Sequence, residues 1–167
     1  MKKIVLMMMV LIGSTALVAC DNDDDNNAFD QKYVTFTRAL QSRFPEAKDI
    51  TWDIEGIYHV ADFNVGHAEM EAWYNGDVQW VMTKTDLDSN LLSVDADVAQ
   101  SFTLGDYGSW DIEEISYYER RDGDFYLFEV EHKNLPEMLL FYATDGTLLK
   151  SVPDLPGYEI TPDTPSL

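Results

Sequence analysis

The chain has 167 residues, and its 31 Asp and Glu residues against 11 Lys and Arg residues give a formal net charge of −20. This balance, with no local basic stretch, argues against nucleic acid as a partner, because clustered lysines and arginines bind phosphate backbones. It disfavours anionic lipid surfaces for the same reason. At 46% hydrophobic and 13% aromatic residues, the sequence is too apolar for general disorder, and its length suits one domain with a core.

The first twenty residues have the pattern of an export signal. Two lysines precede a short apolar run that Gly13-Ser14-Thr15 interrupts, which favours a signal peptide over a transmembrane helix of about 20 apolar residues. Leu17–Cys20 resembles the bacterial lipobox. The resemblance implies removal of residues 1–19 and acylation of Cys20, giving an anchor of several acyl chains. The alternative is an ordinary secretory signal with Cys20 as a bystander.

An acidic tether, residues 20–28, follows this signal. Its aspartates imitate the start of a calcium loop, but Asn26 stands where the turn needs glycine and Lys32 where the glutamate belongs, so we expect no calcium site. The acidic stretch also resembles the surface-export signal of lipoproteins in Bacteroidetes-type bacteria. This predicts an exported outer-membrane lipoprotein, on the periplasmic side or at the cell surface; in other bacteria, an Asp after Cys20 would favour the inner membrane.

Residues 29–44 are predicted to form a helix, since large apolar residues recur at steps of three and four. Asp30 is the expected cap, and Pro45 the expected stop. The apolar period then changes to two, which predicts strands at 50–54, 58–64, 69–74 and 78–82. Asn75-Gly76 is predicted to form the tight turn before the last of them.

The second half repeats this order. It predicts a short helix over 95–102 and strands at 112–118, 125–131, 137–142 and 147–152, with a turn at Asp145-Gly146. Because Glu69–Tyr74 resembles Glu137–Tyr142, we infer a duplication with repeats 29–87 and 92–152. A Pro-rich tail, residues 153–167, ends the chain, and beyond Tyr158 we expect a flexible segment without fixed structure.

These motifs resemble the PepSY-like, beta-lactamase-inhibitor-like exported proteins of Bacteroides and relatives. The similarity covers roughly residues 30–152 and rests on the following segments: Phe44–Ala47, Trp52, Glu71–Gly76, Trp110–Ile115 and Tyr142–Gly146. It implies an α+β fold in which a tandem repeat of helix plus four antiparallel strands forms one continuous sheet, with the helices on one face and the other face open. Most members lack an assigned activity, and an inhibitor role would follow only from analogy of fold.

The sequence lacks a catalytic or metal-binding motif. The three histidines, His59, His67 and His132, have no zinc-ligand spacing. Ser109 is outside any nucleophile elbow, and Cys20 is the only cysteine. Glycosidase-like carboxylate pairs are expected by chance at this acid density. We therefore expect no enzyme, no metal and no cofactor.

Aromatic residues among carboxylates are the best candidate for a binding surface. Alternation puts Trp73 and Phe141 on the face opposite the helices. The residues predicted to share that face and contact a partner are Tyr58, Asp62, Glu69, Glu71, Trp73, Glu129, Leu139 and Phe141. The alternative is that both rings only stabilise cross-strand pairs. Trp52 and Trp80 are expected in the core or at its edge.

The sequence thus predicts a non-catalytic, lipid-anchored envelope protein. We expect its open sheet face to bind a protein or peptide of basic character, since charge rims set specificity and association rate. Its only membrane contact would be the lipid anchor. The competing hypothesis is a glycan or small-molecule binding lipoprotein, because exposed rings beside carboxylates also suit sugars.

Overall fold

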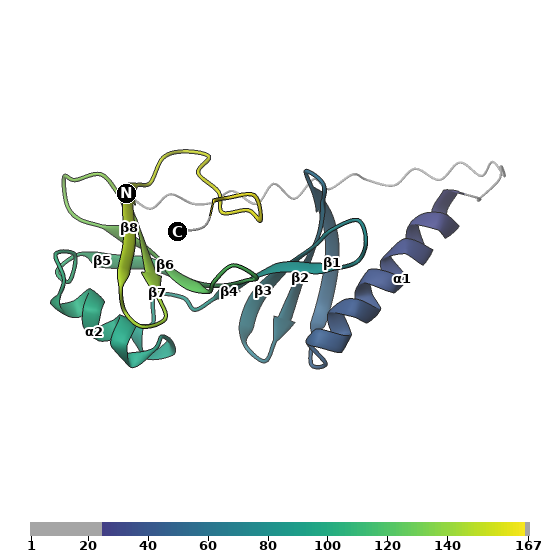
Figure 1. Ribbon diagram of the computed structural model, residues 1–167, viewed down its shortest axis with the longest axis horizontal. Coiled ribbons are helices and arrows are strands. Elements are labelled where there is room, and N and C mark those ends of the chain that lie inside the picture. The colour runs from purple at the N-terminus through teal and green to yellow at the C-terminus, as the bar shows by residue number, and fades with distance from the viewer. Residues whose placement is uncertain (1–24, 166–167) are drawn as a thin grey trace, which may run out of the picture.

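The computed structural model describes residues 25–165, so the predicted leader, Cys20 and residues 21–24 of the tether lie outside the described part. A helix followed by four strands occurs twice along the chain (Figure 1). No helix within residues 25–165 has the length and apolarity needed to cross a membrane.

The first half contains α1 (Asp25–Arg43), β1 (Lys48–Glu55), β2 (Tyr58–Val65), β3 (Ala68–Tyr74) and β4 (Trp80–Asp86). The helix ends at Arg43 because Pro45 disfavours the helical conformation of Phe44. It begins at Asp25, so the predicted tether is too long and Asp30 is not the cap; acidic residues are favourable in a first helical turn, where the helix dipole is positive.

Residues 75–79 form a longer loop than predicted. Asn75 Oδ1 accepts hydrogen bonds of 3.0 Å from the backbone N–H groups of Asp77 and Gln79, and the Asn75 N–H donates to the Gln79 carbonyl oxygen at 3.0 Å. The predicted hairpin turn at Asn75-Gly76 is present, since the Val78 N–H donates to the Asn75 carbonyl oxygen at 3.0 Å, but β4 begins at Trp80, two residues later than predicted.

The second half contains the 3-10 turn η1 (Leu91–Ser93), α2 (Ala96–Leu104), β5 (Asp111–Arg120), β6 (Phe125–Glu131), β7 (Met138–Ala143) and β8 (Leu148–Pro153). The predicted turn at Asp145-Gly146 is confirmed. The Ala143 N–H donates to the Thr147 carbonyl oxygen at 2.9 Å, and Gly146 has a φ of 85°, which favours glycine.

All eight strands form one antiparallel sheet in the order β1 to β8. Both helices pack on the same face: Phe36 and Leu40 of α1 pack with residues of β1 to β4, while Val98 and Phe102 of α2 pack with residues of β5 to β7. Trp52 packs with Phe36 in the first core. The half-buried Trp80 lies at its edge, under the Arg43 guanidinium, whose Cζ is 3.8 Å from the ring centroid. The α+β architecture is confirmed.

Candidate functional site

The C-terminal segment, residues 154–165, covers the sheet face opposite the helices, and we call it the strap. Ile160 is its buried anchor, 8% exposed, and packs in one apolar cluster with Trp73 and Phe141. The other buried members of this cluster are Val60, Met82, Tyr118, Phe125, Leu127 and Leu139. The prediction that this face is open is therefore wrong, because the strap shields its apolar residues from water.

Hydrogen bonds hold the strap at both ends. Nη2 of Arg120 donates to the Thr164 carbonyl oxygen at 2.8 Å and to that of Pro162 at 3.4 Å. Tyr58 Oη donates to Asp163 Oδ1 at 2.9 Å, and the Asp154 N–H donates to the Glu137 carbonyl oxygen at 2.8 Å. The prediction of a flexible tail over 153–167 is thus wrong for the strap, while residues 166 and 167 lie outside the described part.

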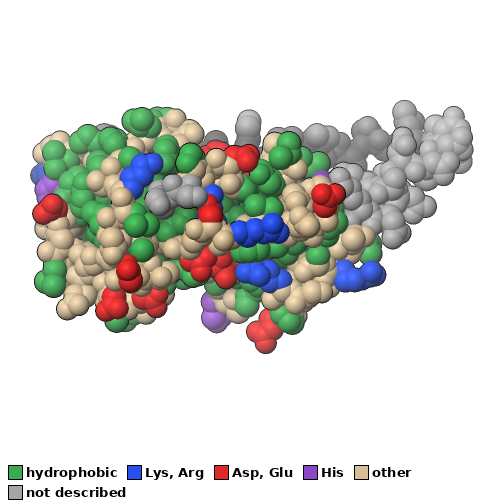
Figure 2. All heavy atoms as spheres, in the orientation of Figure 1, with side chains coloured by type: hydrophobic (Ala, Val, Ile, Leu, Met, Phe, Trp, Pro, Cys, Tyr) green, Lys and Arg blue, Asp and Glu red, His purple; other side chains and the backbone are tan. Residues whose placement is uncertain are grey.

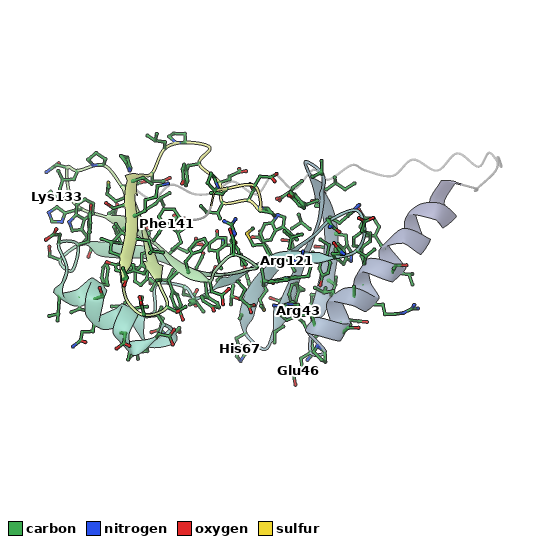
Figure 3. The ribbon with its side chains drawn as sticks, viewed as in Figure 1. Arg43, Glu46, His67, Arg121, Lys133 and Phe141 are labelled. Carbon is green, nitrogen blue, oxygen red and sulfur yellow. The ribbon has the colours of Figure 1, made fainter. Side chains whose placement is uncertain are left out.

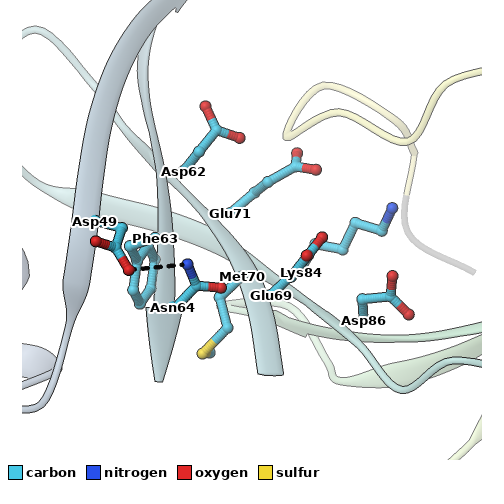
Figure 4. Close-up of a pocket in the computed structure, with 9 residues that line it drawn as sticks. All are labelled: Asp49, Asp62, Phe63, Asn64, Glu69, Met70, Glu71, Lys84 and Asp86. Carbon is cyan, nitrogen blue, oxygen red and sulfur yellow. Dashed lines mark hydrogen bonds between the residues drawn. The ribbon is translucent and has the colours of Figure 1, made fainter. Parts of the chain in front are cut away.

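Three adjoining cavities form what we call the acidic groove. Their volumes are about 190, 310 and 420 Å³; the first two share Glu71 and Lys84, and the last two share Glu55 and Trp73. Ten carboxylates line the groove: Asp49, Asp62, Glu69, Glu71, Asp86, Glu55, Glu129, Asp154, Glu159 and Asp163. Among the described residues, Lys84 is the only basic side chain that lines it. Figure 4 shows the first cavity, and in Figure 2 red acidic side chains gather near the middle of the molecule.

Strand register places like charges directly opposite one another on this face. Asp62 pairs with Glu71 between β2 and β3, and Glu114 pairs with Glu129 between β5 and β6. Such pairs destabilise an antiparallel sheet. Lys84 lies opposite Glu71, and its Nζ is 3.2 Å from Glu114 Oε1. The Lys84 ammonium thus lies beside one carboxylate of each pair, and the groove remains strongly negative.

Burial and mutual repulsion raise pKa values in the groove. Burial, followed by repulsion from Glu114 and Asp154, raises the pKa of Glu129 to about 7. Burial also raises the pKa of Glu71, and Lys84 opposes this only in part. Burial disfavours a charge of either sign, but the carboxylates of Glu114 and Glu71 outweigh it at Lys84 and raise the pKa of that ammonium, so this part of the groove favours a cation.

Most of the predicted site residues lie together. Those that line the groove are Tyr58, Asp62, Glu69, Glu71, Trp73, Glu129 and Leu139. Trp73 is only 3% exposed, and its Nε1 donates to Glu55 Oε2 at 3.0 Å. Phe141, a residue of β7, is 0% exposed and lies within the molecule (Figure 3). The expectation that both rings are exposed is wrong; alternation along the strands assigns the face but does not show what covers it.

Several groove residues were not predicted from the sequence. Alternation along β1 and β4 puts Glu55 and Lys84 on the same face as Glu71, so a signal for these two was present. The strap carboxylates Asp154, Glu159 and Asp163 had no such signal, because the Pro-rich segment has no hydrophobic period.

The histidines are not part of the groove. His59 lies on the helix-covered side, where its ring centroid is 4.3 Å from that of Phe36. The His132 ring centroid is 5.5 Å from that of Trp110, and His67 is at the tip of the β2–β3 hairpin, away from Phe141 (Figure 3). Across residues 25–165, no three His, Cys, Asp or Glu side chains are grouped to hold a metal ion.

Comparison with known proteins gives structural neighbours only. No protein-family model matches the chain, and no curated protein is significantly similar to it. A DUF2874 family protein from Bacteroides ovatus is 26% identical, with a TM-score of 0.66 over 71% of this chain and 85% of that one. A BLIP-like protein from Bacteroides fragilis is 24% identical, with a TM-score of 0.68 over 76% and 91%. A Bacteroides eggerthii protein labelled as periplasmic is 22% identical, with a TM-score of 0.65 over 71% and 86%.

These neighbours support a BLIP-like fold. The label of the third is consistent with export. The names of the three proteins include no enzyme activity.

Proposed function

We propose that this chain is a non-catalytic, lipid-anchored envelope protein that binds a basic protein or peptide along its acidic groove. The observation that carries the proposal is the charge of the groove, where ten carboxylates surround a single ammonium, that of Lys84. A partner with lysine or arginine side chains would relieve the repulsion between Asp62 and Glu71 and between Glu114 and Glu129.

The proposed contact surface differs from the one that the sequence suggested. Charge, and not exposed aromatic rings, is the feature that a partner would meet first, because Trp73 and Phe141 are covered. A strongly negative surface speeds association with a basic partner and makes binding sensitive to salt. The BLIP-like name of one neighbour supports an inhibitor-like role as an analogy of fold only.

The envelope location and the internal duplication belong to this proposal. The lipobox-like Leu17–Cys20 and the acidic stretch after it support an outer-membrane lipoprotein, on the periplasmic side or at the surface. The similarity of Glu69–Tyr74 to Glu137–Tyr142, with helix and four strands occurring twice, supports a duplicated PepSY-like unit. The glycan alternative loses its main support, since it needed Trp73 and Phe141 as accessible stacking surfaces.

The test compares two variants that remove the same charge. Asp62→Asn, Glu71→Gln and Glu129→Gln together remove three of the ten carboxylates of the groove, while Glu46→Gln with Asp106→Asn and Asp111→Asn removes three exposed carboxylates outside it. Binding of a fluorescent lysine-rich peptide and of a matched glutamate-rich peptide is measured by anisotropy at low and high salt. Each lost charge contact is worth about 1 kcal/mol.

We expect the groove variant to bind the lysine-rich peptide at least about tenfold more weakly than the unmodified protein at low salt. The control variant should stay within about threefold, because long-range charge is screened. Equal losses in the two variants would show that only net charge matters, and the groove would then not be the site.

A further inference from the structure

The strap lies on the face that the proposed partner needs, and its own charge is unfavourable there. It adds Asp154, Glu159 and Asp163 to a groove that the sheet already lines with seven carboxylates. The strap stays in place through the burial of Ile160 and through the hydrogen bonds of Arg120 and Tyr58. Its electrostatic contribution therefore opposes the apolar and hydrogen-bonded contacts that hold it.

Beyond the backbone hydrogen bond from Asp154 to Glu137 at its start, the strap is separate from the hydrogen-bonded ladder of the sheet. β8 ends at Pro153, and residues 154–165 pair with no strand in the described part of the chain. In the same segment, Leu155 is 61% exposed and Tyr158 is only partly buried against the apolar cluster, so Ile160 is the buried apolar anchor of the strap. Segments with few backbone hydrogen bonds to the fold open at low free energy.

We propose that the strap is a built-in competitor that a basic peptide displaces from the acidic groove. This inference rests on the proposed function and specifies its partner: a segment with an apolar side chain for the Ile160 seat and lysine or arginine side chains beside Glu71 and Glu129. The exchange replaces three carboxylates by cations on a negative surface. The covalent link favours the strap instead, because it gives the strap an effective concentration on the order of millimolar.

The experiment uses residues 21–167 and a fluorescent ten-residue peptide with a central isoleucine between lysines. Ile160→Ala weakens the anchor of the strap. Arg120→Gln, outside the apolar cluster, releases the carbonyl oxygens of Pro162 and Thr164 together with the ion pair to Asp122. Leu155→Ala is the matched control, since it shortens an exposed leucine in the same segment. Methyl NMR of isoleucine-labelled protein reports whether Ile160 leaves its seat.

We expect Ile160→Ala and Arg120→Gln each to bind the lysine peptide about five- to tenfold more tightly, because a larger fraction of the protein is ready to bind. Leu155→Ala should stay within about twofold. The Ile160 methyl signal should move when the peptide saturates the unmodified protein.

Two results would overturn the displacement of the strap but leave the groove as a binding site. The first is that Ile160→Ala and Arg120→Gln bind the lysine peptide as tightly as the unmodified protein, with no change in the Ile160 methyl signal. The second is that these two variants bind the peptide more weakly, which would show that the strap forms part of the binding site. Failure of the lysine peptide to bind every variant would overturn the proposed function itself, and the displacement with it.

Discussion

Replacing Glu129 with glutamine should stabilise the protein at pH 8 and leave its stability unchanged at pH 4. Burial, then Glu114 and Asp154, raises the pKa of Glu129 from 4.5 to about 7 in the folded protein. The folded state therefore binds more protons than the unfolded state between these pH values, and the free energy of unfolding falls as the pH rises through this window. Glutamine keeps the shape of the side chain without its charge and removes this fall.

The size of the effect follows from the shift. A displacement from 4.5 to about 7 corresponds at full strength to about 3.4 kcal/mol. Glu129 is half-buried, so water screens part of this energy, and we expect a gain of about 1 to 2 kcal/mol at pH 8. At pH 4 the carboxyl is neutral in the folded state and largely so in the unfolded state, and the two proteins should differ by less than about 0.5 kcal/mol.

Urea unfolding at pH 4, 6 and 8 measures this difference. Asp106→Asn, which removes an exposed carboxylate outside the groove, should change the free energy of unfolding by less than about 0.5 kcal/mol at each pH. A Glu129→Gln difference that does not grow from pH 4 to pH 8, or a variant less stable at pH 8, would refute the view that this carboxylate lies among uncompensated negative charges.

Two further predictions concern packing, and chemical denaturation measures both. Phe141→Ala should lower the free energy of unfolding by about 3 to 5 kcal/mol, because the ring is 0% exposed. The control Leu149→Ala, at a site 42% exposed, should lower it by less than about 1 kcal/mol. Similar losses in the two variants would contradict the burial of Phe141. Gly146→Ala should cost about 3 kcal/mol, since φ is 85° and the new Cβ would lie 2.6 Å from the Asp97 carbonyl oxygen. Gly66→Ala, with φ of 65° and nothing within 4 Å, should cost about 1 kcal/mol, and equal costs would argue against the close approach at Asp97.

The order of the helices and strands, and the sheet face of the main aromatic and acidic strand residues, could be predicted from the sequence. Changes of hydrophobic period separate helices from strands, and period-two alternation places Trp73, Glu71 and Glu129 on the face opposite the helices, as the register shows. Hairpin connections then leave few choices of neighbour. The turn after Tyr74 was predicted, but the length of its loop was not, because that length depends on hydrogen bonds to the Asn75 side chain.

The strap could not be predicted in the same way. Its seat depends on contacts between residues far apart in sequence, such as those of Arg120 with Pro162 and Thr164. The strap is rich in Pro, Asp and Thr, which is the composition of an unstructured tail. Ile160 is buried because it packs into the apolar cluster around Trp73. Local patterns do not describe such a contact.

The strongest reason to regard the acidic groove as functional is that stability alone disfavours it. Cross-strand carboxylates at Asp62 and Glu71, and again at Glu114 and Glu129, weaken the sheet that holds them. A sequence selected only for stability would pair each with lysine or threonine, which fit the same positions. Residue pairs that lower the stability of a fold without a structural benefit are expected at functional sites. In the proposed function, a cationic partner would convert the repulsion at both pairs into binding energy.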